Sequence, residues 1–373
     1  MADTYQPIFF TESSKNLGGQ ELQLIQQMIE LEKRSIKTIL FCRENSAVFS
    51  CAQQNSLTVV PTRFRNAADL QSLATLLKYL LMERPAAVIC HSGHDAIISA
   101  LSVKVFRCIS PLTKTRVIRM RTYQPGIPGA VPYNYMFDMT YTPSNYLRSQ
   151  LLVNPKINAR KIGVLLPGID FTRLDSPTLS LPADLITWIA GSEGPLLVHG
   201  AMLRAEKGHQ IILSALKTLK NVFPDIRYLI VGDGPLRQEL ERIVAAEQLT
   251  HHVRFAGFLP NIGDVLRYAT LAVFPSTYEP LGMFQIESQY LGVPTIASNI
   301  GGIPETIQDG ITGHLVPSDD PAVWNRAIIQ LLTNSETQMR YRNASREFVE
   351  KRFSVDTNTS RLIAICYESV GDA

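Results

Sequence analysis

The sequence predicts a two-domain α/β protein in which each domain is built on a parallel sheet covered by helices. The chain has 373 residues, whereas a domain usually holds ~100–150. Short apolar runs alternate with amphipathic stretches, which is typical of right-handed β-α-β units. The same alternation restarts after a stretch rich in Pro, Gly, Ser and Thr between residues 170 and 195, which suits a linker followed by the start of a new domain. We therefore expect domains over 1–175 and 190–350, followed by a helix over 351–373 that packs back on the first domain.

The first domain is expected to contain short buried strands separated by helices. A proline precedes the first strand, where its missing N–H is tolerated, and the first helix repeats its apolar residues at helical spacing. The predicted strands cover Ile8–Thr11, Ile36–Cys42, Ala86–Cys90 and Arg116–Met120, and the predicted helices cover Gly19–Arg34, Asp69–Met82 and Asp95–Val105.

The second domain repeats this pattern after the break. Its expected strands cover Leu196–His199, Arg227–Val231, Val253–Phe255, Leu271–Pro275 and Pro294–Ala297. Its expected helices cover His209–Lys220, Leu236–Glu247, Met283–Leu291, a stretch that begins near Pro304, and most of Ser335–Val370. No repeat of short period accompanies this duplication of one architecture.

Composition excludes several classes of protein. A net charge of +3 is too small for a polycation that coats nucleic acid, so we expect no nucleic-acid partner. Five cysteines without metal-ligand spacing favour a reducing cytosol over a disulfide scaffold or structural zinc. No apolar run approaches the ~18 residues of a membrane span, and the N-terminus lacks the layout of a signal peptide. A cytoplasmic protein, in contact with a membrane only peripherally, is expected.

The small net charge conceals an uneven distribution. Residues 1–180 carry 20 Lys+Arg and 12 Asp+Glu, a net of +8, whereas residues 181–373 carry 16 and 21, a net of −5. Much of the excess falls in a basic window: Lys104, Arg107, Lys114, Arg116, Arg119 and Arg121. A solvated basic face explains it, and so does a surface that meets an anionic acceptor or anionic lipid, where each basic residue contributes ~1 kcal/mol.

The segment TYEPLGMFQIESQYLGVPTIAS carries two glutamates, Glu279 and Glu287, with seven residues between them. It follows a buried strand, so Glu279 is expected in a loop and Glu287 in the next helix. Backbone N–H groups at the start of that helix form a natural anion site; they belong to Leu281, Gly282, Met283 and Phe284. Two carboxylates beside an anion site can hold a hydroxyl-rich donor such as a sugar nucleotide, one on the sugar and one on the ribose. Two unrelated surface glutamates are the simpler alternative.

A second segment, LLVHGAMLRAEKGHQIILSAL, places Arg204 and Lys207 just after the first strand of the second domain. The rigid donor fork of Arg and the mobile charge of Lys suit a diphosphate leaving group, although a pair of solvated loop cations is also compatible. Farther on, VGDGPLRQELERI has Gly232 and Gly234 at a strand-to-helix turn. It lacks the third glycine of a dinucleotide fingerprint, because Arg237 stands there, so NAD binding is poorly supported.

The remaining patterns are weaker. SNIGGIPETIQDGITGHLVP reads mainly as architecture, with glycines where the backbone needs freedom. Gly18 and Gly19 precede a helix and could let the backbone approach a ligand. His91 stands at the end of a buried strand in AAVICHSGHD, at the edge where parallel sheets bind ligands. There is no Ser-His-Asp arrangement, P-loop or cluster with metal-ligand spacing.

Together these segments resemble the retaining glycosyltransferases of the GT-B fold, specifically family four, also called the group 1 glycosyltransferases. The resemblance is dense from Leu196 to Leu332, through LRAEKGH, VGDGP, VRFAGF, FPSTYEPLGMFQIE and GGIPE, and thinner before that, through GGQE, CHSGHD and LPGID. It implies two Rossmann-like domains that face each other across a cleft. The C-terminal domain would hold a UDP-, GDP- or ADP-linked sugar, and the N-terminal domain a glycan or lipid-linked acceptor.

The resemblance also implies roles for individual residues. Glu279 would contact the donor sugar and Glu287 the ribose hydroxyls, while Lys207 with Arg204 would neutralise the diphosphate. His91 would touch the transferred sugar. The other donor contacts would come from Gly18, Gly19, Gly234, Phe258, Leu281, Gly282, Met283 and Phe284. Family members transfer sugar with retention and without a required metal, and the departing diphosphate helps to deprotonate the acceptor, so no cofactor is expected.

Two departures from the family pattern bear on these expectations. Ala201-Met202-Leu203 stands where many members have Gly-Arg-Leu, and Arg204 lies two positions after the usual arginine. Pro167-Gly168 replaces an Asn-Gly and reads as architectural. The favoured function is transfer of a hexose-type sugar in polysaccharide or lipopolysaccharide biosynthesis, at the inner face of the membrane if peripheral. A catalytically silent GT-B binding or assembly subunit and a GT-B sugar-nucleotide epimerase are the alternatives.

Overall fold

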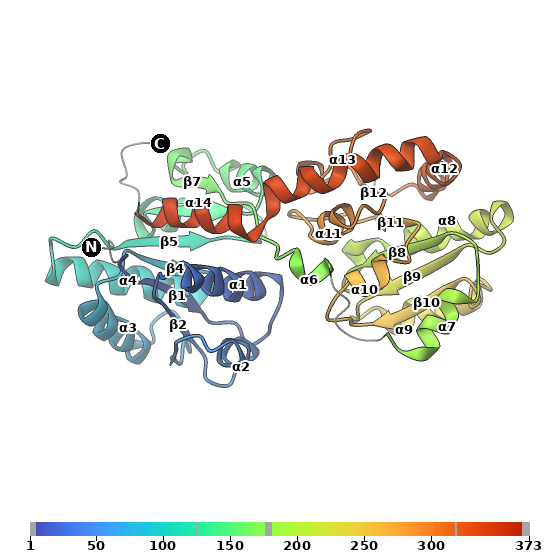
Figure 1. The fold of residues 1–373 in the computed structure, drawn as a ribbon. Helices are drawn as coiled ribbons and strands as arrows, with labels where there is room; N and C mark the ends of the chain where they lie inside the picture. The colour runs from blue at the N-terminus through green and yellow to red at the C-terminus, as the bar shows by residue number, and fades with distance from the viewer. Residues whose placement is uncertain (1–4, 124–125, 176–180, 318, 368–373) are drawn as a thin grey trace. The chain divides into compact units, whose positions relative to one another are not determined.

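The computed structural model describes residues 5–123, 126–175, 181–317 and 319–367. The chain forms two compact units, one of Met1–Ile169 with Phe353–Ala373 and one of Asp170–Arg352. Each unit holds a sheet whose strands pair in parallel, with helices beside it (Figure 1). The predicted α/β class is therefore confirmed. The first unit ends at Ile169, slightly before the boundary expected from the sequence.

The first sheet has the strand order β3-β2-β1-β4-β5-β6-β7. Its strands are β1 (Ile8–Glu12), β2 (Thr38–Cys42), β3 (Val59–Pro61), β4 (Ala87–Cys90), β5 (Arg116–Met120), β6 (Met139–Thr142) and β7 (Ile162–Val164). Ile8 pairs with Thr38 on one side and with Ala87 on the other. Both faces of β1 are buried, so it begins with the continuous apolar run Ile8–Phe10 rather than with an alternating pattern.

Helices cover both faces of this sheet. They are α1 (Gly19–Lys33), α2 (Ala47–Gln54), α3 (Leu70–Glu83), α4 (Gly93–Ile109), α5 (Asn145–Leu152) and α14 (Val355–Tyr367). Ile8 and Phe10 pack with α1, α2 and α14, whereas Phe9 faces α3 and α4. Helix α14 is held to α1 by a 2.9 Å hydrogen bond from Gln27 Nε2 to Asn358 Oδ1. A β-carbon on Gly168 would lie 2.6 Å from Asn358 Cβ, so this glycine makes room for α14.

The second sheet has the order β10-β9-β8-β11-β12-β13. Its strands are β8 (Leu196–Gly200), β9 (Arg227–Val231), β10 (Val253–Gly257), β11 (Leu271–Phe274), β12 (Thr295–Ser298) and β13 (His314–Val316). The helices are α6 (Thr172–Asp175), α7 (Ala183–Ala190), α8 (His209–Val222), α9 (Arg237–Ala246), α10 (Gly263–Leu266), α11 (Phe284–Tyr290), α12 (Pro321–Leu332) and α13 (Ser335–Phe353). One core joins the sheet to α8, α9 and α12, and the other joins it to α7, α10 and α11.

Several local predictions were wrong or incomplete. The stretch from 170 to 195 was expected to be a linker but contains α6 and α7. No long helix begins near Pro304: a 3₁₀ turn (Ile303–Glu305) stops there, and the chain turns at Asp309-Gly310 into β13. The elements α2, β3, β6, α5, β7, α10, α12 and β13 and a π-helical turn (Pro132–Met136) were missed. Apart from α12, which has 12 residues, they have at most eight residues each, so sequence periodicity had few repeats to reveal them.

Candidate functional site

In each sheet, the first strand of the unit lies between the second strand and a later one, so the direction in which strands are added reverses there. In the second unit β8 lies between β9 and β11, so the chain leaves β8 in one direction across the sheet and returns on its other side at β11. Ligands of open α/β sheets bind at such a point, outside the carboxyl ends of the strands. The loops that leave β8 and β11 carry Lys207 and Glu279, two of the predicted site residues.

Lys207 and Glu279 form an ion pair that is largely shielded from water. Lys207 Nζ lies 2.5 Å from Glu279 Oε2, and the two side chains are 19% and 10% exposed. The ammonium also lies 5.8 Å from the centre of the Phe274 ring at the end of β11. Charges in such a place act more strongly than charges at the surface because water screens them less. The structure thus brings together two residues that are 72 positions apart in the sequence.

Close backbone contacts fix the two loops against each other. Gly208, directly after Lys207, has φ +69°, and a β-carbon there would lie 1.9 Å from the carbonyl oxygen of Pro275. Thr277 N–H donates to Glu206 O at 2.8 Å. Only glycine meets both demands on Gly208, a left-handed backbone and contact with a neighbouring carbonyl. The geometry of Lys207 therefore depends on the residue that follows it.

Two further glycines, Gly301 and Gly302, lie against the backbone of the loop that carries Glu279. Gly302 N–H donates to Glu279 O at 3.0 Å, and a β-carbon on Gly301 would lie 2.1 Å from the same oxygen. A β-carbon on Gly302 would lie 2.0 Å from Pro280 O. The architectural interpretation of this glycine-rich segment agrees with these contacts, and its effect is to hold the Glu279 loop.

Glu287, the second glutamate of the motif, lies in α11 and is buried. Arg173 from α6 donates to its Oε1. Burial raises the pKa of the Glu287 carboxyl, and the nearby Arg173 opposes that rise. Sequence reasoning missed Arg173 because it stands in the stretch interpreted as a linker, and nothing in its local pattern points to a site.

The residues between the two glutamates serve packing as well as any site. Leu281 and Phe284 are buried, and Phe284 fills the space over Gly200, whose β-carbon would lie 2.6 Å from the ring. Gly282 has φ +86° and lets the chain turn into α11. Met283 is the N-cap residue of α11, and its side chain makes no capping hydrogen bond. Helix α11 has only seven residues, so its dipole is a weaker source of positive potential than the sequence suggested.

Three other predicted site residues of this unit, Arg204, Gly234 and Phe258, differ in their exposure and contacts. Arg204 is half-exposed, with Nη1 3.9 Å from Glu206 Oε1. A β-carbon on Gly234 would lie 2.7 Å from both Leu203 N and Leu203 O, so this glycine lets the loops after β8 and β9 pack together. Phe258 follows β10 with 78% of its side chain exposed, and its ring is open to a planar ligand.

In the first unit, His91 stands at the corresponding reversal, after β4. Its ring is buried, and Nδ1 lies 3.2 Å from Thr11 O. A carbonyl only accepts, so Nδ1 carries the hydrogen and Nε2 keeps its lone pair. Burial lowers the pKa of His91, although Asp95 acts in the opposite direction. The ring is therefore a neutral acceptor at Nε2.

Two buried carboxylates beside His91 were missed by sequence reasoning. Glu12 accepts hydrogen bonds from Ser14 N at 2.7 Å, from Gln20 Nε2 at 2.9 Å and from Ser92 Oγ. Because Gln20 lies in the first turn of α1 and Ser92 directly precedes α4, Glu12 joins the start of α1 to the segment that follows β4 and contains His91. The sequence did hold a signal, since an acidic residue stands two positions after the apolar run Ile8–Phe10, at the carboxyl end of a strand.

Asp95 is the second of these carboxylates. It accepts from Ser13 Oγ at 2.8 Å, Thr11 Oγ1 at 3.0 Å and His91 N at 3.1 Å. Burial, with a contribution from the charge of Glu12, raises the pKa of Asp95 to about 6. Two acids held this close in a buried place titrate as a pair.

Gly18 and Gly19 are exposed at the start of α1. Gly18 N–H donates to Glu21 Oε2 at 2.8 Å, and a β-carbon on Gly19 would meet nothing within 4 Å. There is open space beside Gly19, as a ligand would require. The carboxylate of Glu21, however, already lies at this helix end.

The six residues of the basic window do not form an exposed basic surface. Arg119 is buried, 5.1 Å from the Phe137 ring and 5.5 Å from the Tyr133 ring. Arg107 pairs with Asp138 at 2.6 Å, and Arg116 donates to a backbone carbonyl of α14 at 2.6 Å. Among its six residues only Lys104 and Lys114 are exposed. The expectation of a basic face is therefore corrected: most of this charge holds the unit together.

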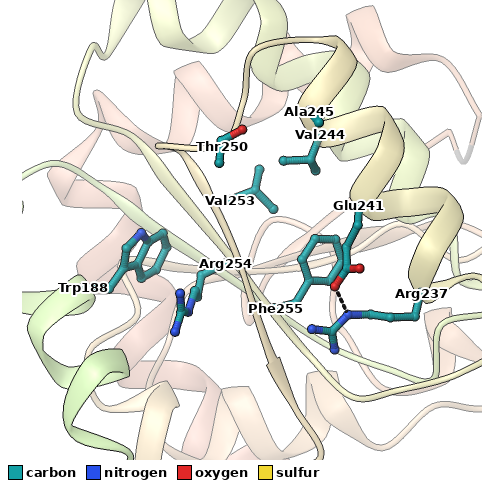
Figure 2. Close-up of a pocket in the computed structure, with 9 residues that line it drawn as sticks. All are labelled: Trp188, Arg237, Glu241, Val244, Ala245, Thr250, Val253, Arg254 and Phe255. Atoms are coloured by element: carbon teal, nitrogen blue, oxygen red, sulfur yellow. Dashed lines mark hydrogen bonds and ion pairs between the residues drawn. The ribbon is translucent and has the colours of Figure 1, made fainter.

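A surface pocket of about 480 Å³ lies along β10, the edge strand of the second sheet (Figure 2). Trp188, Phe255 and two arginines line it, but Arg237 is paired with Glu241 and Arg254 with Asp184. Two strands separate β10 from β11, and neighbouring strands are ~4.8 Å apart. The pocket is therefore distinct from the Lys207–Glu279 site, and its arginines are already neutralised.

Across 5–123, 126–175, 181–317 and 319–367, no helix is long and apolar enough to cross a membrane. In the same ranges no three His, Cys, Asp or Glu side chains gather in a way that could hold a metal ion.

The chain is similar to known glycosyltransferases in its sequence. Residues 189–348 match the family model of the glycosyl transferases group 1. A phosphatidyl-myo-inositol mannosyltransferase of Mycobacterium leprae is 32% identical over 47% of this chain and 46% of its own length. The alpha-D-kanosaminyltransferase of Streptomyces kanamyceticus is 28% identical over 53% and 51%. The chain thus spans about half the length of the curated relatives it matches.

Solved structures extend the similarity in fold to the whole chain. A glycosyltransferase from Rickettsia africae superposes with a TM-score of 0.85 at 19% identity and full coverage of both chains. Anabaena HepE, crystallised with UDP, gives a TM-score of 0.81 at 18% identity over 96% of this chain and 99% of that one. At such identities the likeness shows the fold, which is GT-B.

Proposed function

Because its C-terminal unit belongs to the group 1 glycosyltransferases and its fold is GT-B, we propose that this chain transfers a sugar from a nucleotide-diphosphate sugar to an acceptor hydroxyl. The observation that carries the proposal is the shielded Lys207–Glu279 pair at the strand reversal of that unit. The proposal takes the transferred group to be a hexose and the reaction to retain the anomeric configuration.

The geometry suggests how the donor would be held. In this proposal Lys207 turns from Glu279 to the diphosphate and stabilises the charge that develops as the bond to the sugar breaks. Glu279 is then free to accept hydrogen bonds from the sugar hydroxyls, and Glu287 accepts those of the ribose. Once it faces the diphosphate, Lys207 contributes to catalysis mainly by electrostatic stabilisation and positioning. No metal is required in this scheme, because Lys207 supplies the positive charge.

We place the acceptor at the first unit, near His91, Glu12 and Asp95. Neutral His91 and the two carboxylates are hydrogen-bond acceptors that suit a hydroxyl-rich group. A glycan or lipid-linked acceptor fits, and one relative is named for its action on a phosphatidylinositol. The proposed pathway is polysaccharide or lipopolysaccharide biosynthesis. An anionic membrane surface has little support, because most of the basic window is engaged internally.

Two measurements test the proposal. Thermal-shift screening against UDP, GDP, ADP and their sugars should reveal a donor, since a ligand at 100 times its Kd stabilises the folded state by about 2.7 kcal/mol. Turnover of that donor should fall about 10²–10³-fold in Lys207→Ala, and remain near wild type in Lys217→Ala, whose partner is the half-exposed Glu247. Full activity in Lys207→Ala would refute the diphosphate assignment. Tight nucleotide binding with no turnover of any donor would favour a catalytically silent subunit.

A further inference from the structure

The Arg173–Glu287 pair links a candidate ligand-binding carboxylate to a residue outside the sequence motifs. The Glu287 side chain is 10% exposed, and the Arg173 side chain is 39% exposed. Among the described residues, Arg173 is the side chain that bonds this carboxylate, and it does so at Oε1. Oε2 has no bonded protein partner in those residues, so one oxygen is anchored and the other can accept from a ligand.

Independent contacts hold the short α6 in place. The Phe171 and Tyr290 rings stack with centres 4.2 Å apart at 8°. Tyr290 Oη donates to Asp175 Oδ2 at 2.8 Å. Asn261 Nδ2 donates to Arg173 O at 2.7 Å. Tyr290 lies on α11 three residues after Glu287, so the segment is docked on the helix that carries the carboxylate. Arg173 therefore presents its guanidinium from a fixed backbone.

We propose that Arg173 is a positioning residue, which keeps the Glu287 carboxylate charged and oriented so that its free oxygen accepts hydrogen bonds from the ribose hydroxyls of the donor. This inference rests on the proposed function and deepens it. It concerns the nucleotide part of the donor and assigns Arg173 no contact with the transferred sugar.

The physical reason lies in the burial of Glu287. A carboxylate removed from water tends to take up a proton, and burial does raise the pKa of Glu287. A guanidinium cannot lose its charge in a protein, so it favours the ionised form at any ordinary pH. An ionised carboxylate accepts stronger hydrogen bonds than a neutral acid, whose O–H would instead need an acceptor of its own.

Binding measurements with a matched pair of nucleotides test this role. UDP, GDP and ADP are titrated into the protein by calorimetry, and the one that binds is compared with its 2′,3′-dideoxy form. Arg173→Gln should weaken the ribonucleotide about tenfold at pH 7, the effect of losing ~1.4 kcal/mol. It should leave the dideoxy form unchanged, and the loss should shrink as the pH rises. Arg173→Lys should restore most of the affinity. Arg267→Gln is the control, because Arg267 donates to the Leu174 carbonyl of the same helix and does not touch Glu287.

Equal weakening of both nucleotides in Arg173→Gln would overturn the proposal, as would wild-type affinity. Tighter binding would show instead that Arg173 competes with the ribose. A second readout needs no nucleotide: the ¹³C carboxyl resonance of Glu287, identified with Glu287→Gln, should titrate at higher pH in Arg173→Gln. An unchanged titration would refute the charge-holding role. One outcome separates the two proposals: no nucleotide binds the wild type, but the titration of Glu287 shifts as expected. The proposed function and the ribose role would then both fail, whereas the effect of Arg173 on the Glu287 carboxyl would stand.

Discussion

Replacing Gly208 by alanine should disturb the junction that holds Lys207 beside Glu279. The residue has φ +69°, and the added β-carbon would lie 1.9 Å from Pro275 O and 2.8 Å from the carbon of the same carbonyl. The left-handed backbone costs an alanine roughly 1–2 kcal/mol. Relief of the overlap requires a backbone shift, which adds roughly 1–3 kcal/mol. We expect the free energy of unfolding of the second unit to fall by roughly 2–5 kcal/mol, with donor turnover reduced as well.

The chain offers both a specific probe and a matched control. Its two tryptophans, Trp188 and Trp324, both lie in the second unit, so tryptophan fluorescence follows the unfolding of that unit alone. Gly310 has φ +73°, but a β-carbon there would meet nothing within 4 Å. Gly310→Ala thus carries the backbone cost without the overlap. At roughly 2–4 °C per kcal/mol for a unit of this size, Gly208→Ala should lower Tm by roughly 4–20 °C and Gly310→Ala by roughly 2–8 °C. Equal losses in the two variants would refute the role of the Pro275 contact.

Three further predictions follow from other contacts. Burial and the charge of Lys207 lower the pKa of His209 to about 4. As the pH falls from about 6.5 toward 4, His209 binds a proton in the unfolded chain but not in the folded unit. The free energy of unfolding of the second unit should therefore fall by roughly 3 kcal/mol over this range. Tryptophan fluorescence measures this loss, and the loss should be smaller in His209→Phe. Arg119→Met should destabilise the first unit by roughly 1–2 kcal/mol, because the guanidinium loses its contacts with two aromatic rings. Lys104→Met is the control and should change the stability by under about 0.5 kcal/mol. Hydrogen exchange of β5 measures both effects, and equal effects would contradict the buried role of Arg119. Removal of divalent metal with EDTA should leave donor turnover unchanged, because Lys207 supplies the cation, and loss of activity that Mg²⁺ restores would disprove this.

Much of the fold could be predicted because it depends on local patterns. The apolar runs in β4 and β9 and the helical periods of α1 and α8 extend over enough residues to be recognised in the sequence. Short elements such as β3 and β7, each of three residues, hold too few repeats for that. The helix expected near Pro304 failed for a different reason: Gly301 and Gly302 serve the backbone of a neighbouring loop, so what looks like a helix start is a packing contact.

The sequence by itself determined the two α/β halves, the Glu279 and Glu287 motif and the lysine at the strand reversal, because these depend on spacing within single segments. Tertiary structure alone decided which charges meet. Arg173 and Glu287 are 114 positions apart, and Glu12 and Ser92 are 80 positions apart. It also turned a basic window into a set of internal contacts for Arg107, Arg116 and Arg119. The physical reason is that the partner of a buried charge is set by the order in which strands assemble into a sheet, and that order brings together residues whose own neighbourhoods in the sequence carry no sign of each other.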